Sequence, residues 1–373
     1  MSTRDFPTAG AAVLRLLTAL LVSLLSLATA ALAEISVTDV TGRTVKLEKP
    51  AHRLLVDDGR YLIALSLIHP DPVSLLTAWP KDINRIGPAV YRRYVEKFPQ
   101  IEKLGQVASS AQQFSVEQVL AAEPDLAVFS LSSKPSDAQI ATLEAAGIPV
   151  VVIDFFNDPL DNLEPGLRLL AAVTGRSAQA EAFIAFRRER MEAVKAKIAS
   201  TSTRPKVFFE AHAARTSECC ASPGNGNIGK YIAFAGGENI GNAVIKGPVG
   251  ALNLEYVIET NPDVYIVSGG PQMEGTNGLL IGPGYDESTI RETLARVVAR
   301  PGISGLKAVT DGRVHGLAHQ LLNSPLDILT VQALARWIHP ELFGDLDLDA
   351  TRREINERFL AVPLDGMSWV DLK

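Results

Sequence analysis

Short apolar runs alternate with helical stretches along most of the chain. In the first half, Arg53–Val56 and Pro149–Ile153 are apolar runs, and the stretch Tyr61–Ile68 has helical character. The second half contains similar runs at Val207–Phe209 and Val264–Val267. Apolar runs without polar alternation are typical of strands that are covered on both faces. Strand, helix and strand in this order predict parallel sheets with right-handed crossovers.

Two segments of the chain, 114–128 and 252–266, resemble each other at a constant offset. Each is predicted to form a short helix, then a Pro-Asp break, then a buried strand, because proline ends a helix and restricts the residue before it. Three pairs of identical residues stand 138 positions apart: Glu117/Glu255, Pro124/Pro262 and Asp125/Asp263. The repeat predicts two similar α/β lobes.

A long helix is predicted between the two halves. Residues 177–199 contain no Gly or Pro and consist mainly of strong helix formers, with Ala180, Ile184 and Val194 on one apolar stripe. At 1.5 Å per residue the helix would be roughly 33 Å long, enough to join two lobes as a stiff strut. The predicted fold is therefore α/β, with two Rossmann-like lobes with parallel sheets joined by one long α-helix. The expected divisions are 34–175, 176–200 and 201–373.

The first 33 residues differ from the rest. Arg4 and Arg15 precede an apolar run at 16–27, and Ala31-Leu32-Ala33 offers a small-residue cleavage site before Glu34. This pattern predicts a secretory signal peptide, and the run is short for a retained membrane anchor. Since no cysteine lies near the cleavage site, a lipid anchor is not expected. The mature protein is expected to be soluble and periplasmic.

Charge and motifs exclude several classes of function. The formal charge of −6 argues against a nucleic-acid partner. Gly224–Gly229 fits G-x-G-x-x-G, but no strand directly precedes it and no carboxylate follows about 20 positions later, so we reject a dinucleotide site. These glycines are expected either to let backbone approach a ligand or a helix, or to form a flexible loop. H-E-x-x-H and G-x-S-x-G are absent, and the six histidines form no recognisable metal set.

Several segments, taken in their order and spacing, carry a family resemblance. These are 37–45, 114–128, 235–240 and 339–348. Over residues 35–365 the chain resembles the substrate-binding proteins of ABC importers for ferric siderophores, haem and cobalamin. The resemblance implies two lobes on one long helix, a ligand cleft between them, and delivery to a membrane permease dimer without catalysis.

Glu117 and Glu255 are the docking residues that the resemblance implies. In the family, a carboxylate at this position on each lobe contacts arginines of the paired permease subunits. One carboxylate per lobe suits a two-fold partner. The alternative is an ordinary solvated glutamate, which is favoured in the first turn of a helix.

The ligand is expected in the cleft, at the carboxyl ends of the strands. Arg60 and Tyr61 could offer a cation, a phenol and a helix N-terminus to an anionic chelate. Ordinary surface or core packing is the alternative for every candidate. The remaining cleft candidates are Arg92 and Phe155 in the first lobe, and His212, Arg215, Gln272 and His319 in the second.

Cys219 and Cys220 are the two cysteines of the chain. Because an exported protein meets an oxidising environment, we favour a disulfide between these neighbours, forming a rigid rim near the cleft. Two free thiols and the binding of a soft metal are the alternatives.

Together these observations predict a periplasmic receptor that feeds an ABC importer and performs no chemistry. Its ligand is expected to be a ferric siderophore, an Fe(III) chelate, and the receptor itself is expected to be a monomer without a cofactor. The lobes should close only slightly, because the helical strut resists hinge motion. Haem, with Tyr61 as an iron ligand, and cobalamin are alternatives, and a secreted α/β enzyme is a rival that lacks a nucleophile–base pair.

Overall fold

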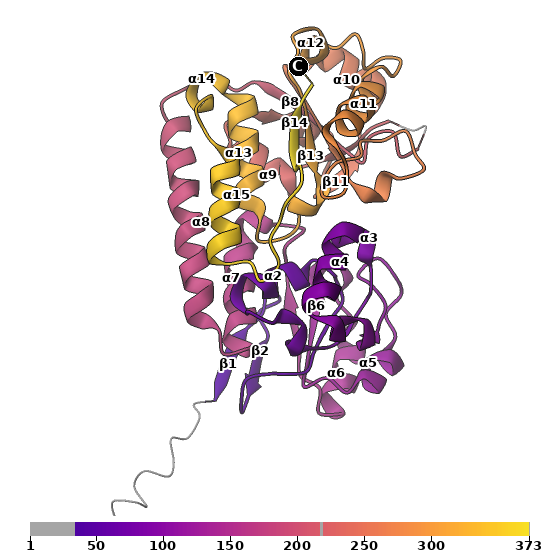
Figure 1. The fold of residues 1–373 in the computed structure, drawn as a ribbon, viewed down its shortest axis with the longest axis vertical. Helices are drawn as coiled ribbons and strands as arrows, with labels where there is room; N and C mark the ends of the chain where they lie inside the picture. The colour runs from indigo at the N-terminus through magenta and orange to yellow at the C-terminus, as the bar shows by residue number, and fades with distance from the viewer. Residues whose placement is uncertain (1–33, 217–218, 373) are drawn as a thin grey trace, which may run out of the picture.

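Two α/β lobes lie one above the other, and helix α8 (Ser177–Ile198) runs along both of them (Figure 1). The computed structural model describes residues 34–216 and 219–372. The expected signal peptide, 1–33, lies outside the described residues. Among the helices that are described, none is long and apolar enough to span a bilayer. The long helix and the two lobes confirm the predicted fold class.

The first lobe is built on a five-stranded sheet in the order β5-β4-β3-β6-β7, with all neighbours parallel. Every residue of β3, β6 and β7 is buried, as expected for strands covered on both faces. The strands are β3 (Leu54–Val56), β4 (Leu76–Trp79), β5 (Gly105–Gln106), β6 (Leu126–Ser130) and β7 (Val150–Ile153). The helices are α2 (Tyr61–Ile68), α3 (Ile83–Ile86), α4 (Pro88–Lys97), α5 (Val116–Ala122), α6 (Asp137–Ala145) and α7 (Pro159–Val173).

The second lobe has a sheet in the order β10-β8-β12-β13-β14, of which β14 alone runs antiparallel to its neighbour. The antiparallel edge departs from the predicted parallel sheet. The strands are β8 (Lys206–Ala211), β10 (Glu238–Asn239), β12 (Val264–Gly269), β13 (Val314–Ala318) and β14 (Trp369–Asp371). The helices are α9 (Ile228–Phe234), α10 (Leu254–Thr260), α11 (Glu287–Val298), α12 (Lys307–Thr310), α13 (Asp327–Ile338), α14 (Pro340–Phe343) and α15 (Leu348–Arg358).

Two small antiparallel sheets of two strands each complete the strands. The first is the hairpin of β1 (Ile35–Thr38) with β2 (Thr44–Leu47), which opens the described part of the chain and overlaps the segment 37–45 of the family resemblance. The second pairs β9 (Ala221–Pro223) with β11 (Val249–Ala251), next to the second sheet.

The internal repeat is visible in three dimensions as two equivalent helices, α5 and α10. Each begins at a capping side chain: Ser115 Oγ accepts a hydrogen bond from Gln118 N at 3.3 Å, and Asn253 Oδ1 accepts one from Glu255 N at 2.8 Å. Each helix is followed by a C-terminal capping residue with positive φ, which stands directly before the Pro-Asp pair. The φ angle is 46° at Glu123 and 47° at Asn261.

The two aspartates of the internal repeat, Asp125 and Asp263, have the same structural role in their lobes. Asp125 accepts the backbone N–H of Arg53 at 2.9 Å, and Asp263 accepts that of Lys206 at the same distance. Arg53 and Lys206 introduce the first core strand of their lobes, β3 and β8. Each aspartate therefore fixes the start of its own strand to the neighbouring strand.

Helix α8 is held to both lobes. Its apolar stripe is buried, as predicted. The buried guanidinium of Arg187 donates to Asp327 on α13 at 2.9 and 2.6 Å, and to Glu164 on α7 at 2.9 Å. The strut is thus tied to the first lobe through α7 and to the second through α13.

The chain returns to the first lobe near its end. Ala361 N donates to Ser66 O on α2 at 3.0 Å, and Lys97 Nζ on α4 donates to Ala361 O at 2.6 Å. The segment after α15, which belongs to the predicted division 201–373 of the second lobe and closing helix, therefore also contacts the first lobe. This contact is a second bridge between the lobes, beside α8.

Candidate ligand-binding site

A cavity of about 650 Å³ lies between the lobes. The residues that line it follow β3, β4 and β5 in the first lobe and β8, β12 and β13 in the second. The cavity therefore sits at the carboxyl ends of both sheets, where the sequence placed it. Five predicted residues line it: Arg60, His212, Arg215, Gln272 and His319.

The first-lobe wall is organised around the buried carboxylate of Asp58. Arg60 donates to both of its oxygens, from Nε at 2.9 Å and from Nη2 at 2.7 Å, and Arg85 forms a further ion pair with it. Burial alone would raise the pKa of Asp58, but the two arginines more than offset it and lower the pKa to about 2. Arg60 and Arg85 are thus held at the cavity wall by a permanently charged anchor.

Asp82 is the one carboxylate among the lining residues. It accepts the backbone N–H of Gly59 at 3.0 Å and lies 3.1 Å from Arg85 Nε. Burial, and then the neighbouring charge of Asp58, raise its pKa to about 6. The loop after β4 therefore carries a carboxylate whose charge changes just below neutral pH.

Two histidines from the second lobe lie against each other, with their ring planes tilted by 39°. The ring centroids of His212 and His319 are 4.0 Å apart, and His319 Nδ1 lies 3.1 Å from Ser268 Oγ. Burial, together with Arg215 and Arg60, lowers the pKa of His212 to about 4. Burial, together with His212 and the arginines, lowers the pKa of His319 well below its usual value. Both rings are neutral at pH 7 and can offer a nitrogen to a ligand.

The wall is cationic and rich in hydrogen-bonding groups. Four of its side chains carry positive charge: Arg60, Lys81, Arg85 and Arg215. Within the part of the chain that is described, Gln272 Nε2 and Gln320 Oε1 are buried without a hydrogen-bond partner. Buried polar groups normally have partners, so these two unpaired amide atoms are candidates for a hydrogen bond that forms when a ligand is bound. The arrangement suits a negatively charged solute with several acceptor atoms.

Three of the predicted ligand residues lie elsewhere. Tyr61 is buried within α2, its hydroxyl lies 2.6 Å from Ser130 Oγ, and its ring packs edge-on against Phe155. Burial raises the pKa of the Tyr61 hydroxyl well above its usual value. Phe155 is part of the same core, and Arg92 lies on the exposed face of α4, outside the cavity lining. Tyr61 and Phe155 are therefore core residues, which was the alternative to ligand binding that the sequence left open.

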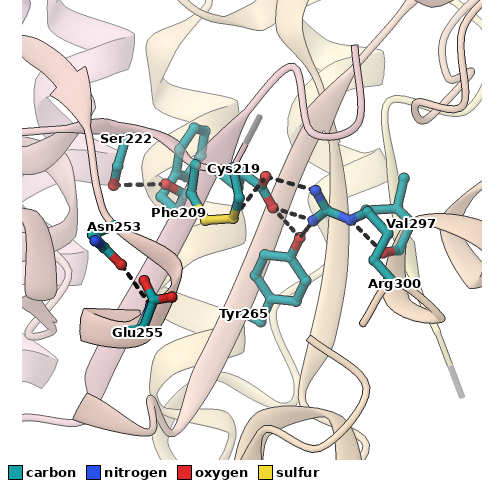
Figure 2. Close-up of a disulfide and its surroundings, with 10 residues drawn as sticks. Phe209, Cys219, Ser222, Asn253, Glu255, Tyr265, Val297 and Arg300 are labelled. Atoms are coloured by element: carbon teal, nitrogen blue, oxygen red, sulfur yellow. Dashed lines mark hydrogen bonds and ion pairs between the residues drawn. A yellow bond between two sulfur atoms is a disulfide. The ribbon is translucent and has the colours of Figure 1, made fainter. Parts of the chain in front are cut away.

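Cys219 and Cys220 form a disulfide, but it does not line the ligand cavity. Cys219 borders a separate hollow of about 840 Å³ in the second lobe. Figure 2 shows Cys219 beside Tyr265 and Arg300. Arg300 Nη1 donates to the nearby carboxylate of Glu210 at 3.0 Å, so this carboxylate is already neutralised. The prediction that the disulfide lies at the cleft was therefore wrong. The pairing of Glu210 with Arg300 gives no support to a metal ion at these cysteines.

The glycine-rich stretch lies where the lobes meet. A Cβ on Gly226 would come within 2.7 Å of Asn157 O in the first lobe, and one on Gly229 within 1.9 Å of Gly224 O. Asn227 N also donates to Asn157 O at 2.8 Å. Gly226 therefore permits close backbone contact with the first lobe, whereas Gly229 permits close packing within the second lobe, and neither lines the ligand cavity.

Glu117 and Glu255 are both exposed, in the first turns of α5 and α10. Neither lines the ligand cavity. The pKa of the Glu117 carboxyl is lowered, first by a hydrogen bond from its own backbone N–H and second by one from Ser115 Oγ, which donates to Oε2 at 2.8 Å. The positions fit a contact with another molecule rather than with the ligand.

Several lining residues were not predicted. Lys81, Asp82 and Arg85 follow β4, and Gln320 follows β13. The sequence does contain a pattern that indicates these residues, because the polar and charged segment 81–85 comes directly after the mostly apolar run Leu75–Trp79 and Pro80. Reading that run as a strand would have placed the cluster at the cleft.

Comparisons with known proteins give a consistent result. A family model described as "Periplasmic binding protein" matches residues 66–321. The molybdate-binding protein MolA of Haemophilus influenzae is 24% identical over 367 residues, covering 90% of this chain and 93% of MolA. A cobalamin-binding protein of Halobacterium salinarum is 28% identical over 188 residues, covering 49% of this chain and 47% of its own.

Solved structures share the fold. The TroA-like periplasmic binding protein FepB from Veillonella parvula has a TM-score of 0.80 at 24% identity, with 91% of this chain and 100% of that chain covered. MolA bound to molybdate has a TM-score of 0.68 at 19% identity, with 89% and 99% covered.

Proposed function

The chain belongs to the periplasmic binding protein family, and from this premise we propose that its ligand is a ferric siderophore, a negatively charged Fe(III) chelate. It is a periplasmic solute-binding protein of an ABC importer, and as a member of a binding-protein family it is not an enzyme. We further propose that residues 1–33 are the signal peptide that exports it.

The cationic wall of the interlobe cavity is the observation that carries the proposal. Four positive side chains and a single carboxylate line it, and Asp58 holds two of the arginines in place. Arginines suit carboxylate, hydroxamate and catecholate oxygens, because the guanidinium offers several donors in one plane. The neutral imidazoles of His212 and His319 could also fill an open coordination position of the iron.

The size of the cavity favours a chelate over a bare oxyanion. A volume of about 650 Å³ is typical of sites for ligands of drug size. The similarity to MolA over most of both chains makes an oxyanion such as molybdate the second candidate. Haem and cobalamin fit less well, because Phe156 is the one Phe, Tyr or Trp side chain in the lining and Tyr61 is buried.

A fluorescence titration of the mature protein tests the ligand class. Trp79 is a suitable fluorescent reporter because it is buried and precedes Pro80, a residue of the cavity lining. Ferric hydroxamate, catecholate and citrate complexes would be compared with molybdate, haem and cobalamin. We expect saturable quenching by one ferric chelate and much weaker binding of its iron-free form. Saturation by molybdate alone would select the second candidate, and a response to haem or cobalamin alone would refute the argument from the lining.

Arg215→Gln is expected to weaken binding of the ferric chelate by about 10- to 100-fold, the loss of one to two charge-assisted hydrogen bonds. Arg215 lines the cavity and is exposed. The measurement is the same titration. Lys195→Gln, an equal loss of charge on the exposed face of α8, should leave the affinity unchanged. Equal effects of the two substitutions would mean that only the net charge of the protein matters.

Acidification from pH 7.5 to pH 5 is expected to strengthen anion binding several-fold. The pKa of Asp82 is about 6, so its negative charge is lost within this window, whereas His212, with a pKa of about 4, stays neutral. A cavity that loses a negative charge attracts an anion more strongly. Titrations with a ferric hydroxamate whose charge is constant over this range would measure the effect. Asp82→Asn should flatten the profile, and an affinity that falls on acidification would contradict this interpretation.

A further inference from the structure

Two exposed apolar side chains occupy equivalent positions of the internal repeat. Among the described residues, four large hydrophobic side chains are exposed: Leu120, Val244, Val249 and Ile258. Leu120 is 37% exposed on α5, and Ile258 is 44% exposed on α10. They stand 138 positions apart, the same offset that relates Glu117 to Glu255. The repeat has therefore kept an apolar side chain at this surface position in both lobes.

The folding of the two helices does not account for these side chains. The inward positions of α5 and α10 are Val119 and Val257, which are almost completely buried. Leu120 and Ile258 follow them and point outward, although Ile258 also lies near Gly302. The exposed parts of both side chains make no contact within the described chain, and their equivalent positions in the repeat point to a shared contact outside it.

Each of the two side chains lies next to a docking glutamate. Residues three apart on a helix are neighbours on its surface, so Leu120 adjoins Glu117 and Ile258 adjoins Glu255. The helices also border open hollows, of about 480 Å³ beside Gln118 and about 430 Å³ beside Tyr256, again 138 positions apart. The equivalent helix of each lobe thus carries an exposed carboxylate and an exposed apolar side chain, and it borders a hollow through another of its residues.

We propose that Leu120 and Ile258 are apolar anchors that insert into matching apolar recesses on the two subunits of the permease. This rests on the proposed docking role of Glu117 and Glu255. An exposed ion pair contributes little because water screens it, and an apolar contact that excludes water beside it strengthens the pair. The partner surface is therefore a cation next to an apolar hollow, present twice. The repeat supplies the argument for a two-fold partner, and the glutamates supply the charge complementarity.

Binding of the mature protein to its importer in lipid nanodiscs tests this proposal. Leu120→Gln and Ile258→Gln are each expected to weaken binding roughly tenfold, which corresponds to about 1.4 kcal/mol. The double variant should weaken it more than either alone. Val249→Thr is the matched control, because Val249 is 49% exposed and its repeat counterpart is the small residue Ala111. Titration with the ferric chelate should show unchanged ligand affinity for all variants, which also shows that they are folded.

The outcomes separate this inference from the docking role of the glutamates. If the double variant Glu117→Lys, Glu255→Lys loses binding but the glutamine variants do not, the proposed role of the apolar anchors is wrong and the proposed docking role of the glutamates stands. Wild-type binding by both sets of variants, or no binding by the wild-type protein, would overturn both proposals. A photo-reactive side chain at position 120 or 258 should cross-link to a permease subunit, and cross-linking from position 249 alone would also contradict the anchors.

Discussion

Replacing Glu117 and Glu255 together by lysine is expected to reduce solute uptake at least 100-fold while changing ligand affinity by less than about twofold. Both carboxylates are exposed and stand outside the ligand cavity, so the ligand should not sense them. In the docking mode proposed here, a lysine at each position would face the cations of both permease subunits, and like-charge contacts at an interface are strongly unfavourable. Uptake of iron from the chelate into importer-containing proteoliposomes, beside the fluorescence titration, measures both effects.

Glu189→Lys with Glu192→Lys is the matched control for this variant. Both glutamates are highly exposed on α8, and the double substitution changes the net charge by the same amount. The control should transport at the wild-type rate. Normal uptake by the Glu117 and Glu255 variant would mean that these are ordinary solvated glutamates, and reduced ligand affinity would mean that they act in the cleft.

The fold could be predicted from sequence because its main elements carry strong local patterns. Strands β3 and β7 are unbroken apolar runs, β8 and β12 contain the apolar runs Val207–Phe209 and Val264–Val267, and α8 is long and free of Gly and Pro. Strand β14 was missed because three residues with one buried side chain give no distinctive pattern. Its place in the sheet depends on pairing with β13, a contact between distant parts of the chain.

The site was predicted in part, since the residue type is visible in a sequence and the direction of its side chain is not. Arg60 and His212 follow strands and do reach the cavity. Tyr61 also follows a strand, but all eight residues of α2 are buried. A helix that is apolar on every side is normally enclosed, so the sequence YLIALSLI could have placed Tyr61 in the core. Nothing local showed that the loop at Cys219 turns away from the cleft.

Arg187→Met is expected to destabilise the protein by about 3–5 kcal/mol, the effect of breaking a buried ion pair. Its side chain is 4% exposed and pairs with Asp327, which is 1% exposed. Burial opposes the charge of Arg187, but Asp327 and Glu164 more than offset this and raise its pKa. Methionine would fill the space but leave the Asp327 carboxylate buried, with Tyr231 Oη, at 2.7 Å, as its remaining side-chain donor. A lower midpoint of urea unfolding, followed by circular dichroism, would show the loss.

Arg188 provides the control on the same helix. It donates to Glu164 Oε2 at 2.8 Å, yet its side chain is 58% exposed, so Arg188→Met should lower stability by less than about 1 kcal/mol. Adding Asp327→Asn to Arg187→Met should restore part of the stability, because the uncompensated charge is then removed. Equal effects of the two arginine substitutions would show that solvent reaches Asp327. A large difference would mean that α8 is held to both lobes by one buried cation, which would limit how far the lobes can move when a ligand binds.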